Sequence, residues 1–459
     1  MKYPPGPSSF WQIIKLLVKR QIDPIGFYES MFAKYGDMVF IQAGKHNFLL
    51  LNNADAIEQV LQTDAKQYKK STAYERFRLI FGNGLLTSEG ELWKKQRRMM
   101  AGAFTVKNIE KLYPLINEET EKMISHWKDS DVVDLAEEMN GLTLQIISRT
   151  MLGELRDEEK KLLRSAVQDM LKYLQTSRHL WLQLFLLIFP IKDRIAFSIK
   201  IESRLPLKST RNFFKSINSI NHLVHRLIET RRLQGRNENL LDLLIRMTDS
   251  DDGSGMTNGQ LRDEVVNVLI AGHETTSNAL SWTFHQLLKY PEVMSKVTTE
   301  VRTMIQGETP TYEEIEKLSY TRAVFQESMR LYPPFWRISR QAQGPTKVQG
   351  FDVPEGTDVI AAIYTVQRSP LYWNGPLKFR PERFLEENAH HKFSYIPFGA
   401  GPRVCIGIHL AMIEAISIIA TCLKKYDITP AFSTDPTPLL SLTMQPKEGC
   451  KVKVKKVPL

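Results

Sequence analysis

A glycine-rich turn around Cys405 carries the residue types that suit a reactive thiolate. The stretch FGAGPRVCIGIHLA begins at Phe398, and the chain has only three cysteines. A thiolate needs nearby positive charge and N–H donors. Arg403 supplies the charge, and the glycines let the backbone fold tightly enough to point N–H groups at a sulfur. The apolar run after Gly407 predicts a helix, whose N-terminus also favours an anion.

This turn offers one cysteine as a metal ligand, because no CxxC pair or histidine partner stands at zinc spacing. A lone thiolate suits haem iron, where it pushes electron density toward bound oxygen. The alternative is a buried structural cysteine, the usual fate of an isolated one. The glycines and Arg403 favour the first interpretation, so Cys405 is predicted to be a metal ligand.

A long helix with a polar centre is predicted to begin at Thr257. Gln260 completes a capping-box pattern, and no proline follows until Pro291, so the helix extends over about 33 residues, or roughly 50 Å. Near its middle, Glu274 and Thr275 place an acid and an alcohol amid apolar residues. Two interpretations stay open: a kink on a solvated face, or a groove beside a buried ligand.

Glu327 and Arg330 lie three residues apart on another predicted helix and are therefore side-chain neighbours. As a surface ion pair they would contribute little to stability. The apolar residues around them favour burial instead, and a buried pair needs further partners. Arg383, in the proline-fixed turn of KFRPERF, is the candidate third member.

The composition is that of an ordinary globular protein of 459 residues, with 42% hydrophobic and 24% charged residues. Three cysteines cannot form a disulfide framework, which favours an intracellular protein. The net charge of +10 admits nucleic acid, an acidic protein or an anionic membrane as a partner. The apolar runs Phe10–Val18 and Leu180–Pro190 are too short to cross a bilayer. The second is interpreted as a buried helix, or as a surface that dips into lipid or admits an apolar substrate.

The chain is predicted to be mainly α with small β-sheets (α+β), in a single domain over residues 1–459. Residues 30–62 hold two strand-like runs, DMVFIQ and NFLLLN, whereas residues 105–290 show mostly helical spacing. Residues 1–22 form a proline-rich start and an amphipathic helix. The C-terminal part is predicted to form a β-hairpin around Pro446–Gly449.

Together these motifs resemble those of the cytochrome P-450 family of haem-thiolate monooxygenases. The stretch from Phe398 to Gly407 fills the family's Phe-x-x-Gly-x-Arg-x-Cys-x-Gly signature, and AGHETT at 271–276 fills its oxygen-activation motif. Three further motifs match in the family's order: Glu327-x-x-Arg330, PERF at 381–384 and Trp93-x-x-x-Arg97. The resemblance covers essentially the whole chain. It implies a large helical domain in which the long helix crosses the haem face.

The resemblance assigns most candidate site residues to a haem, expected as haem b. Cys405 becomes the proximal iron ligand, and Glu327, Arg330 and Arg383 become a structural triad. Haem contacts, including those to the propionates, are expected from Trp93, Arg97, Arg340, Phe398, Arg403 and Gly407. Gln367 stands where many relatives carry a histidine, which leaves one propionate contact in question.

By the same resemblance, Glu274 and Thr275 relay the protons that cleavage of dioxygen requires, and one oxygen atom enters a C–H bond. The substrate pocket is expected to be lined by Leu86, Ala271, Thr275, Phe335, Trp336 and Leu442. Because most of these are apolar, a lipophilic substrate is expected. Fatty acids come first, with terpenoids, retinoids or steroids as rivals. Arg337 either meets a carboxylate or faces the haem edge.

No fused reductase is expected, so electrons come from a separate ferredoxin, flavodoxin or reductase. Lys94, Lys95, Arg97 and Arg98 cluster on one predicted helix and form the expected docking face for an acidic partner. The expected protein is a cytoplasmic monomer that uses O2 and binds no nucleic acid, with peripheral membrane contact as an alternative. The rival functions are a peroxide-using or rearranging haem-thiolate enzyme and a non-catalytic haem sensor. The acid–threonine pair argues against both.

Overall fold

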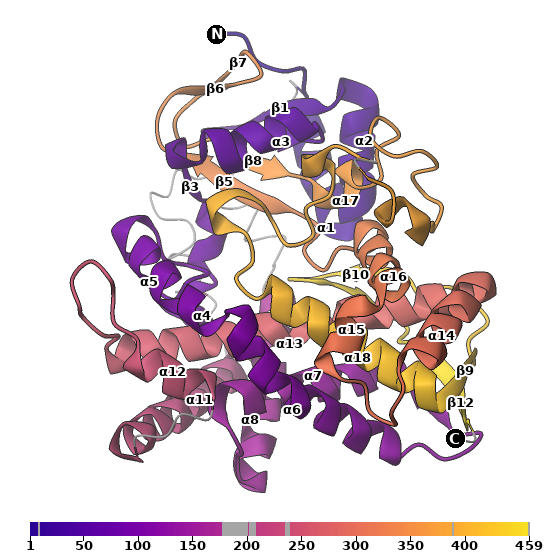
Figure 1. The fold of residues 1–459 in the computed structure, drawn as a ribbon. Coiled ribbons are helices and arrows are strands. Elements are labelled where there is room, and N and C mark those ends of the chain that lie inside the picture. Colours follow the sequence, from indigo (N-terminus) through magenta and orange to yellow (C-terminus); the bar gives the residue numbers. More distant parts are fainter. Residues whose placement is uncertain (8–9, 177–200, 202–207, 235–238, 388–389, 458–459) are drawn as a thin grey trace.

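The computed structural model describes residues 1–7, 10–176, 201, 208–234, 239–387 and 390–457. A helical body fills one half of the molecule, and the five-stranded sheet with the β6–β7 pair, α1 and α2 fills the other, while β9 and β12 lie beside α14 and α18 in the helical half (Figure 1). The predicted class, mainly α with small sheets, is therefore confirmed. The run Leu180–Pro190 lies outside the described residues. Within the described residues, no helix combines the length and apolarity that crossing a bilayer requires.

The α-helices follow the three- and four-residue apolar spacing of the sequence. They are α1 (Phe10–Ile22), α2 (Pro24–Tyr35), α3 (Ala54–Glu58), α4 (Arg78–Phe81), α5 (Gly90–Ala103), α6 (Val106–Ser125), α7 (Leu135–Leu152), α8 (Asp157–Thr176), α11 (Lys208–Gln234), α12 (Leu240–Arg246), α13 (Asn258–Lys289), α14 (Pro291–Met304), α15 (Tyr312–Lys317), α16 (Ser319–Leu331), α17 (Ile363–Val366) and α18 (Ile408–Lys425).

The largest sheet has the strand order β1-β2-β8-β5-β3, and only the β2–β8 pair is parallel. Its first two strands match the runs predicted within residues 30–62 and pair from Met38↔Leu51 to Ala43↔His46. The strands of all sheets are β1 (Met38–Ala43), β2 (His46–Leu51), β3 (Tyr68–Lys70), β4 (Val132–Asp134), β5 (Ile338–Ala342), β6 (Thr346–Val348), β7 (Phe351–Val353), β8 (Asp358–Ala361), β9 (Tyr426–Pro430), β10 (Pro438–Leu440), β11 (Met444–Pro446) and β12 (Lys451–Lys456).

The hairpin predicted around Pro446–Gly449 is wrong. β11 pairs with the strand before it, β10, whereas β12 joins β4 and β9 in a separate sheet. The cause lies at Gly449, which has φ +76° and packs so closely on Asp134 that a Cβ would lie 2.2 Å from its carboxylate. The same carboxylate accepts the N–H of Cys450 at 2.8 Å. The chain is therefore turned away from β11 before β12 begins.

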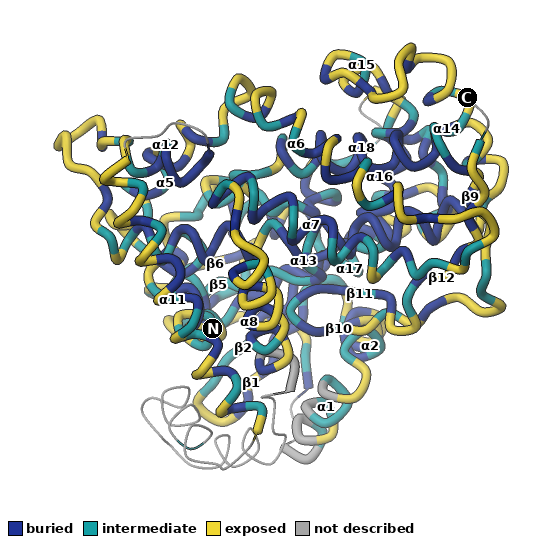
Figure 2. Tube along the Cα trace, turned by 90° about the horizontal axis from the view of Figure 1, so that it is seen from below, coloured by how far each residue is buried: buried dark blue, intermediate teal, exposed yellow. Residues whose placement is uncertain are grey.

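The long helix α13 forms the centre of the helical body. The predicted start is confirmed, because the Thr257 hydroxyl and the Gln260 side chain cap each other's backbone N–H groups. The helix has 32 residues and ends before Pro291, which gives it a length of about 48 Å. It packs against α7, α11, α16 and α18, and it lies in the buried interior when the molecule is seen from below (Figure 2).

Candidate active site

The turn that carries Cys405 is held in place by its glycines. Gly401 has φ +68°, and a Cβ there would lie 1.9 Å from the carbonyl oxygen of Leu61, so only glycine fits. Beyond it, the N–H of Cys405 donates to the Phe398 carbonyl at 2.9 Å. Helix α18 begins immediately after Gly407, as predicted.

The Cys405 side chain keeps exposed surface, yet desolvation by the surrounding protein raises the pKa of its thiol. An exposed surface and a desolvated thiol are compatible if the sulfur faces a space enclosed by protein. Two groups act in the opposite direction and lower this pKa: the N–H of Gly407 and the guanidinium of Arg97. The turn therefore supplies the sulfur with the partners that a bound thiolate needs.

Helix α13 opens to this interior at one place only. From Glu264 to Leu288, every residue is buried except Ala271, Gly272 and Thr275. These three lie on one face of the helix, because their spacing is one, three and four residues. Helix α18, which follows the cysteine turn, packs against α13.

Glu274 is 4% exposed, and its Oε2 has no hydrogen-bond partner among the described residues. Burial raises its pKa to about 7, and the hydroxyl of Thr443 partly offsets this. Asn278 donates its Nδ2 to Thr443 Oγ1 at 3.0 Å, which leaves the Thr443 proton free to face the acid. Thr275 donates its own hydroxyl to the Ala271 carbonyl at 2.6 Å. The acid therefore gains and loses a proton near neutral pH, beside a second hydroxyl that sequence reasoning missed.

A group of cations lies between the cysteine turn and the main sheet. Arg403 covers the Trp93 ring at 4.1 Å from its centroid, donates to the Ser88 carbonyl at 3.1 Å and pairs with Glu89. Arg340 is close enough to lower the pKa of Arg403. Within this group, Glu89 is the one carboxylate that forms an ion pair with a described cation.

Lys70 is a third member of this group that the sequence analysis did not predict. The antiparallel pairing of β3 with β5 sets it opposite Arg340, and its amine donates to the carbonyls of Leu85, at 3.0 Å, and Leu86. Burial lowers the pKa of Lys70 strongly, with a further contribution from Arg403. An anionic ligand would relieve this excess of positive charge, and haem propionates carry two carboxylates. In the sequence, Lys70 is visible only as part of a Lys-Lys pair. Its role could not be predicted because Arg340, its neighbour across the strands, is 270 residues away.

Glu327, Arg330 and Arg383 meet in a buried cluster. The Arg330 guanidinium donates to both carboxylate oxygens of Glu327, at 2.6 and 2.9 Å, and Arg383 Nε donates to Glu327 Oε1 at 3.1 Å. Arg330 also donates to the carbonyls of Gln367 and Pro376, at 2.7 and 2.8 Å. All donors of this buried ion pair are thus satisfied by neighbouring groups, which is the condition for it to be tolerated.

Gln367 belongs to this brace and does not face the cation group. Its amide nitrogen donates to the carbonyls of Met329 and Arg330, at 3.0 and 2.9 Å, and its oxygen accepts the N–H of Ile396 at 2.9 Å. The side chain is fully buried. It therefore connects α16 to the segment that leads into the cysteine turn. This structural role explains the buried position of Gln367 without any contact to a propionate.

Three of the predicted pocket segments border α13. Leu86 donates its N–H to Asn267 of this helix at 3.2 Å, and Leu442 precedes Thr443, which Asn278 contacts. Phe335 follows Pro334, whose carbonyl accepts the N–H of Met444 at 2.9 Å, and the Met444 carbonyl in turn accepts the indole N–H of Trp282 of α13 at 3.3 Å.

Trp336, also predicted to line the pocket, belongs to an apolar cluster that includes Trp282 of α13 and Met444 of β11. Its ring is 5% exposed, packs edge-on against Tyr28 of α2 at 5.9 Å and is covered by Arg337. This places it in the apolar cluster under the main sheet. Arg337 donates to the Tyr28 hydroxyl at 3.5 Å, so its contacts lie on that side of the molecule.

The basic residues of α5 are mostly paired. Lys94 forms an ion pair with Glu91 of the same helix, whereas Lys95 and Arg98 pair with the acidic loop after α12. That loop contributes Asp249, Asp251 and Asp252. The net positive charge of this face is therefore smaller than the sequence of α5 indicates.

Comparisons with known proteins agree with this geometry. The sequence profile of the family described as cytochrome P-450 matches residues 4–454. Cyclooctat-9-en-7-ol 5-monooxygenase of Streptomyces melanosporofaciens is 30% identical over 414 residues, which cover 90% of this chain and 86% of the relative. Pentalenene oxygenase of Streptomyces avermitilis is 29% identical and covers 96% and 93%. The fold of a cytochrome P-450 haem domain in a crystal structure is similar with a TM-score of 0.85 at 23% identity, covering 100% of this chain and 99% of that one.

Proposed function

This chain belongs to the cytochrome P-450 family and is a monooxygenase, and on that premise we propose that it hydroxylates a lipophilic substrate of the terpenoid class. The observation that carries the proposal is the single exposed face of α13, with Ala271, Gly272 and Thr275. It is small and largely apolar, and Glu274 lies directly beside it. The proposed unit is one haem-thiolate domain over residues 1–459.

The residues present fit a haem b. The N–H of Gly407 and the guanidinium of Arg97 both act on the Cys405 sulfur, which are the partners that a thiolate ligand of the haem iron would require. Lys70, Arg340 and Arg403, a group whose paired carboxylate is Glu89, would hold the propionates together with Trp93. When bound, haem-thiolate supplies the redox centre at which dioxygen is activated with two electrons and two protons.

The chain's own contribution is the delivery of protons and the exclusion of water. Glu274, with a pKa of about 7, accepts a proton from one side and releases it on the other without a large change in free energy. Thr275 holds its hydroxyl against the Ala271 carbonyl and is able to turn this proton toward the open face. The buried residues on either side of the face keep bulk water from reaching it.

Terpenoids take precedence over the fatty acids that the sequence analysis ranked first. Two of the relatives are named for oxygenation of cyclooctat-9-en-7-ol and pentalenene, and a short exposed face on α13 suits a compact ring system. The electron donor is proposed to be a separate protein. Because Lys95 and Arg98 are already paired, such a donor would have to displace the acidic loop or approach beside it.

The test is a titration of the ferric protein with a panel of cyclic terpenes and straight-chain fatty acids, read as the spin-state change of the Soret band. Tighter binding of the terpenes and a hydroxylated product with NADPH and a surrogate reductase are expected. Ala271→Leu should abolish the terpene response by filling the face, whereas Ala101→Leu on the exposed side of α5 should not change it. A response to fatty acids alone would overturn the substrate class. Binding without product would favour a sensor, and product formation from peroxide alone would favour a peroxide-using enzyme.

A further inference from the structure

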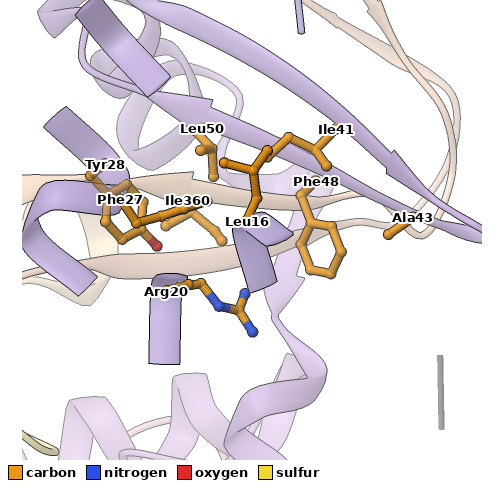
Figure 3. A pocket seen from close by; sticks show the side chains of 9 residues that line it. All are labelled: Leu16, Arg20, Phe27, Tyr28, Ile41, Ala43, Phe48, Leu50 and Ile360. Carbon is orange, nitrogen blue, oxygen red and sulfur yellow. The ribbon is translucent and has the colours of Figure 1, made fainter. Parts of the chain in front are cut away.

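A small cavity lies on the sheet side of the molecule, between the N-terminal helices and the main sheet (Figure 3). Its walls are mostly apolar side chains of α1, α2, β1, β2 and β8. The free volume is about 20 Å3, the room of one water-sized group. This cavity is too small for a substrate, so substrate selectivity depends on what bounds the exposed face of α13.

The exposed face of α13 ends where a loop covers the helix. Glu264 and Asn267 stand seven and four residues before Ala271 and therefore lie on the same face as Ala271. Unlike Ala271, both are buried, at 0% and 4% exposure. The backbone that contacts them belongs to residues 82–89, the loop that connects α4 to α5.

Glu264 and Asn267 each hold one backbone N–H group of this loop. Glu264 Oε2 accepts the N–H of Leu85 at 3.0 Å. Asn267 Oδ1 accepts the N–H of the next residue, Leu86, at 3.2 Å. The two side chains therefore bind consecutive residues of the loop and keep it on the face that Ala271 continues.

The Asn267 amide is fixed in the orientation that this contact needs. Its Nδ2 donates to the carbonyls of Phe81, at 3.1 Å, and Asp263, at 2.6 Å, so its oxygen must face the loop. A Cβ at Gly84 would lie 1.9 Å from the same Nδ2. The loop therefore packs on Asn267 so closely that glycine is required at position 84.

The carbonyl groups of the loop have a second set of partners. Lys70 donates to the carbonyls of Leu85, at 3.0 Å, and Leu86, and Arg403 donates to the carbonyl of Ser88 at 3.1 Å. The loop is thus bound to α13 through its N–H groups and to the cation group through its carbonyls. These contacts fix its place on α13 and hence the extent of the exposed face.

We propose that Glu264 and Asn267 are positioning residues that determine substrate selectivity, because they hold residues 82–89 against α13 and so limit the exposed face to the positions around Ala271. The proposal rests on the proposed function, in which the substrate lies on this face. With the loop in place a compact ligand is favoured over an extended one. Release of the loop would lengthen the open face by about 10 Å, from residue 271 to residue 264.

Binding of two iron-directed imidazoles to the ferric holoprotein tests the proposal. The compact probe is 4-phenylimidazole, the extended probe is 1-dodecylimidazole, and both are read from the red shift of the Soret band. Glu264→Leu and Asn267→Ala should each raise the affinity for the extended probe relative to the compact one by about tenfold or more.

Two variants serve as matched controls. Burial raises the pKa of Glu264 to about 8, so the acid is largely neutral at pH 7. Glu264→Gln should therefore leave the affinity ratio unchanged, because its amide oxygen still accepts the N–H of Leu85. Ser281→Ala loses a buried hydrogen bond of 2.8 Å elsewhere on α13 and should also leave the ratio unchanged.

Gly84→Ala disturbs the same contact from the side of the loop. Its Cβ would displace the Asn267 amide, so the affinity ratio should shift in the same direction. Adding Asn267→Ala to this variant should produce little further change, since both substitutions break one contact. Melting temperatures of all variants check that each one folds.

An unchanged ratio in both Glu264→Leu and Asn267→Ala would overturn the proposal. An equal shift in Ser281→Ala or in Glu264→Gln would also overturn it, because neither variant removes an acceptor from the loop. Both probes bind the iron whatever the natural substrate is. Failure of terpenes to bind would therefore refute the proposed substrate class and leave this test intact.

Discussion

Glu414 on α18 is a buried acid that has no charge partner among the residues the structure describes, and its replacement by glutamine should stabilise the protein in a pH-dependent way. The side chain is 2% exposed, and its Oε1 accepts no hydrogen bond from any described residue. Desolvation raises its pKa from 4.5 to about 8. The unfolded chain thus ionises this group at a lower pH than the folded protein does.

The sign follows from proton counting. Between pH 4.5 and pH 8 the unfolded state binds fewer protons than the folded state, so the stability of the folded protein falls as the pH rises and levels off above pH 8. From the two pKa values, the cost of Glu414 is about 1 kcal/mol at pH 5 and about 4 kcal/mol at pH 8. Glu414→Gln removes the ionisable group while keeping its shape, so the variant should gain these amounts.

The assay is thermal unfolding of the wild type and the variant from pH 5 to pH 8. A chain of this length has an unfolding entropy of about 1 kcal/mol per degree, so the midpoint should rise by about 4 °C at pH 8 and about 1 °C at pH 5. Glu355→Gln, at an exposed turn, is the matched control and should show no such trend. A gain of equal size at both pH values, or no gain at pH 8, would refute the reasoning.

Three further predictions concern the candidate active site. Thr275→Ala should raise hydrogen peroxide release per NADPH consumed severalfold, whereas Thr283→Ala, which loses a similar bond to the carbonyl one turn earlier, should not; equal coupling in both would contradict the proton relay. Arg330→Lys cannot maintain the bidentate contact with Glu327 and should destabilise the fold by about 3 kcal/mol or more, which should appear as a lower haem content of the purified protein. A full complement of haem would argue against a structural role for the Glu327–Arg330–Arg383 cluster. Gly401→Ala should lose haem far more than Gly399→Ala, because a Cβ at 401 meets a backbone oxygen at 1.9 Å and at 399 meets nothing closer than 3.5 Å; equal losses would mean that only the positive φ matters.

The parts of the fold that were predictable are those set by local chemistry. The capping box at Thr257, the proline at 291 and the alternation of strands within residues 30–62 each depend on neighbouring residues, and each prediction is confirmed. The glycine turn before α18 is also local, because its positive φ values at 399 and 401 require glycine.

The parts that sequence reasoning missed depend on residues far apart in the chain. Lys70 gains its place only through the pairing of β3 with β5. Thr443 reaches Glu274 only because β10 and β11 bring it to α13. The hairpin expected around Gly449 failed for the same reason, since Asp134, more than 300 residues earlier, redirects the chain. A periodicity argument carries no information about such partners.

The three exposed positions of α13 have a consequence for how the protein diversifies. Packing and site shape are assigned to different residues of one helix, so replacement of the exposed Ala271 should alter the site without disturbing the core. Gly272 is more constrained, because a Cβ there would press on the end of the Ile147 side chain at 2.9 Å. A scaffold of this kind changes its selectivity at a tolerant position, which makes a set of substitutions at 271 the economical route to new substrates, with Thr275 kept for its hydroxyl.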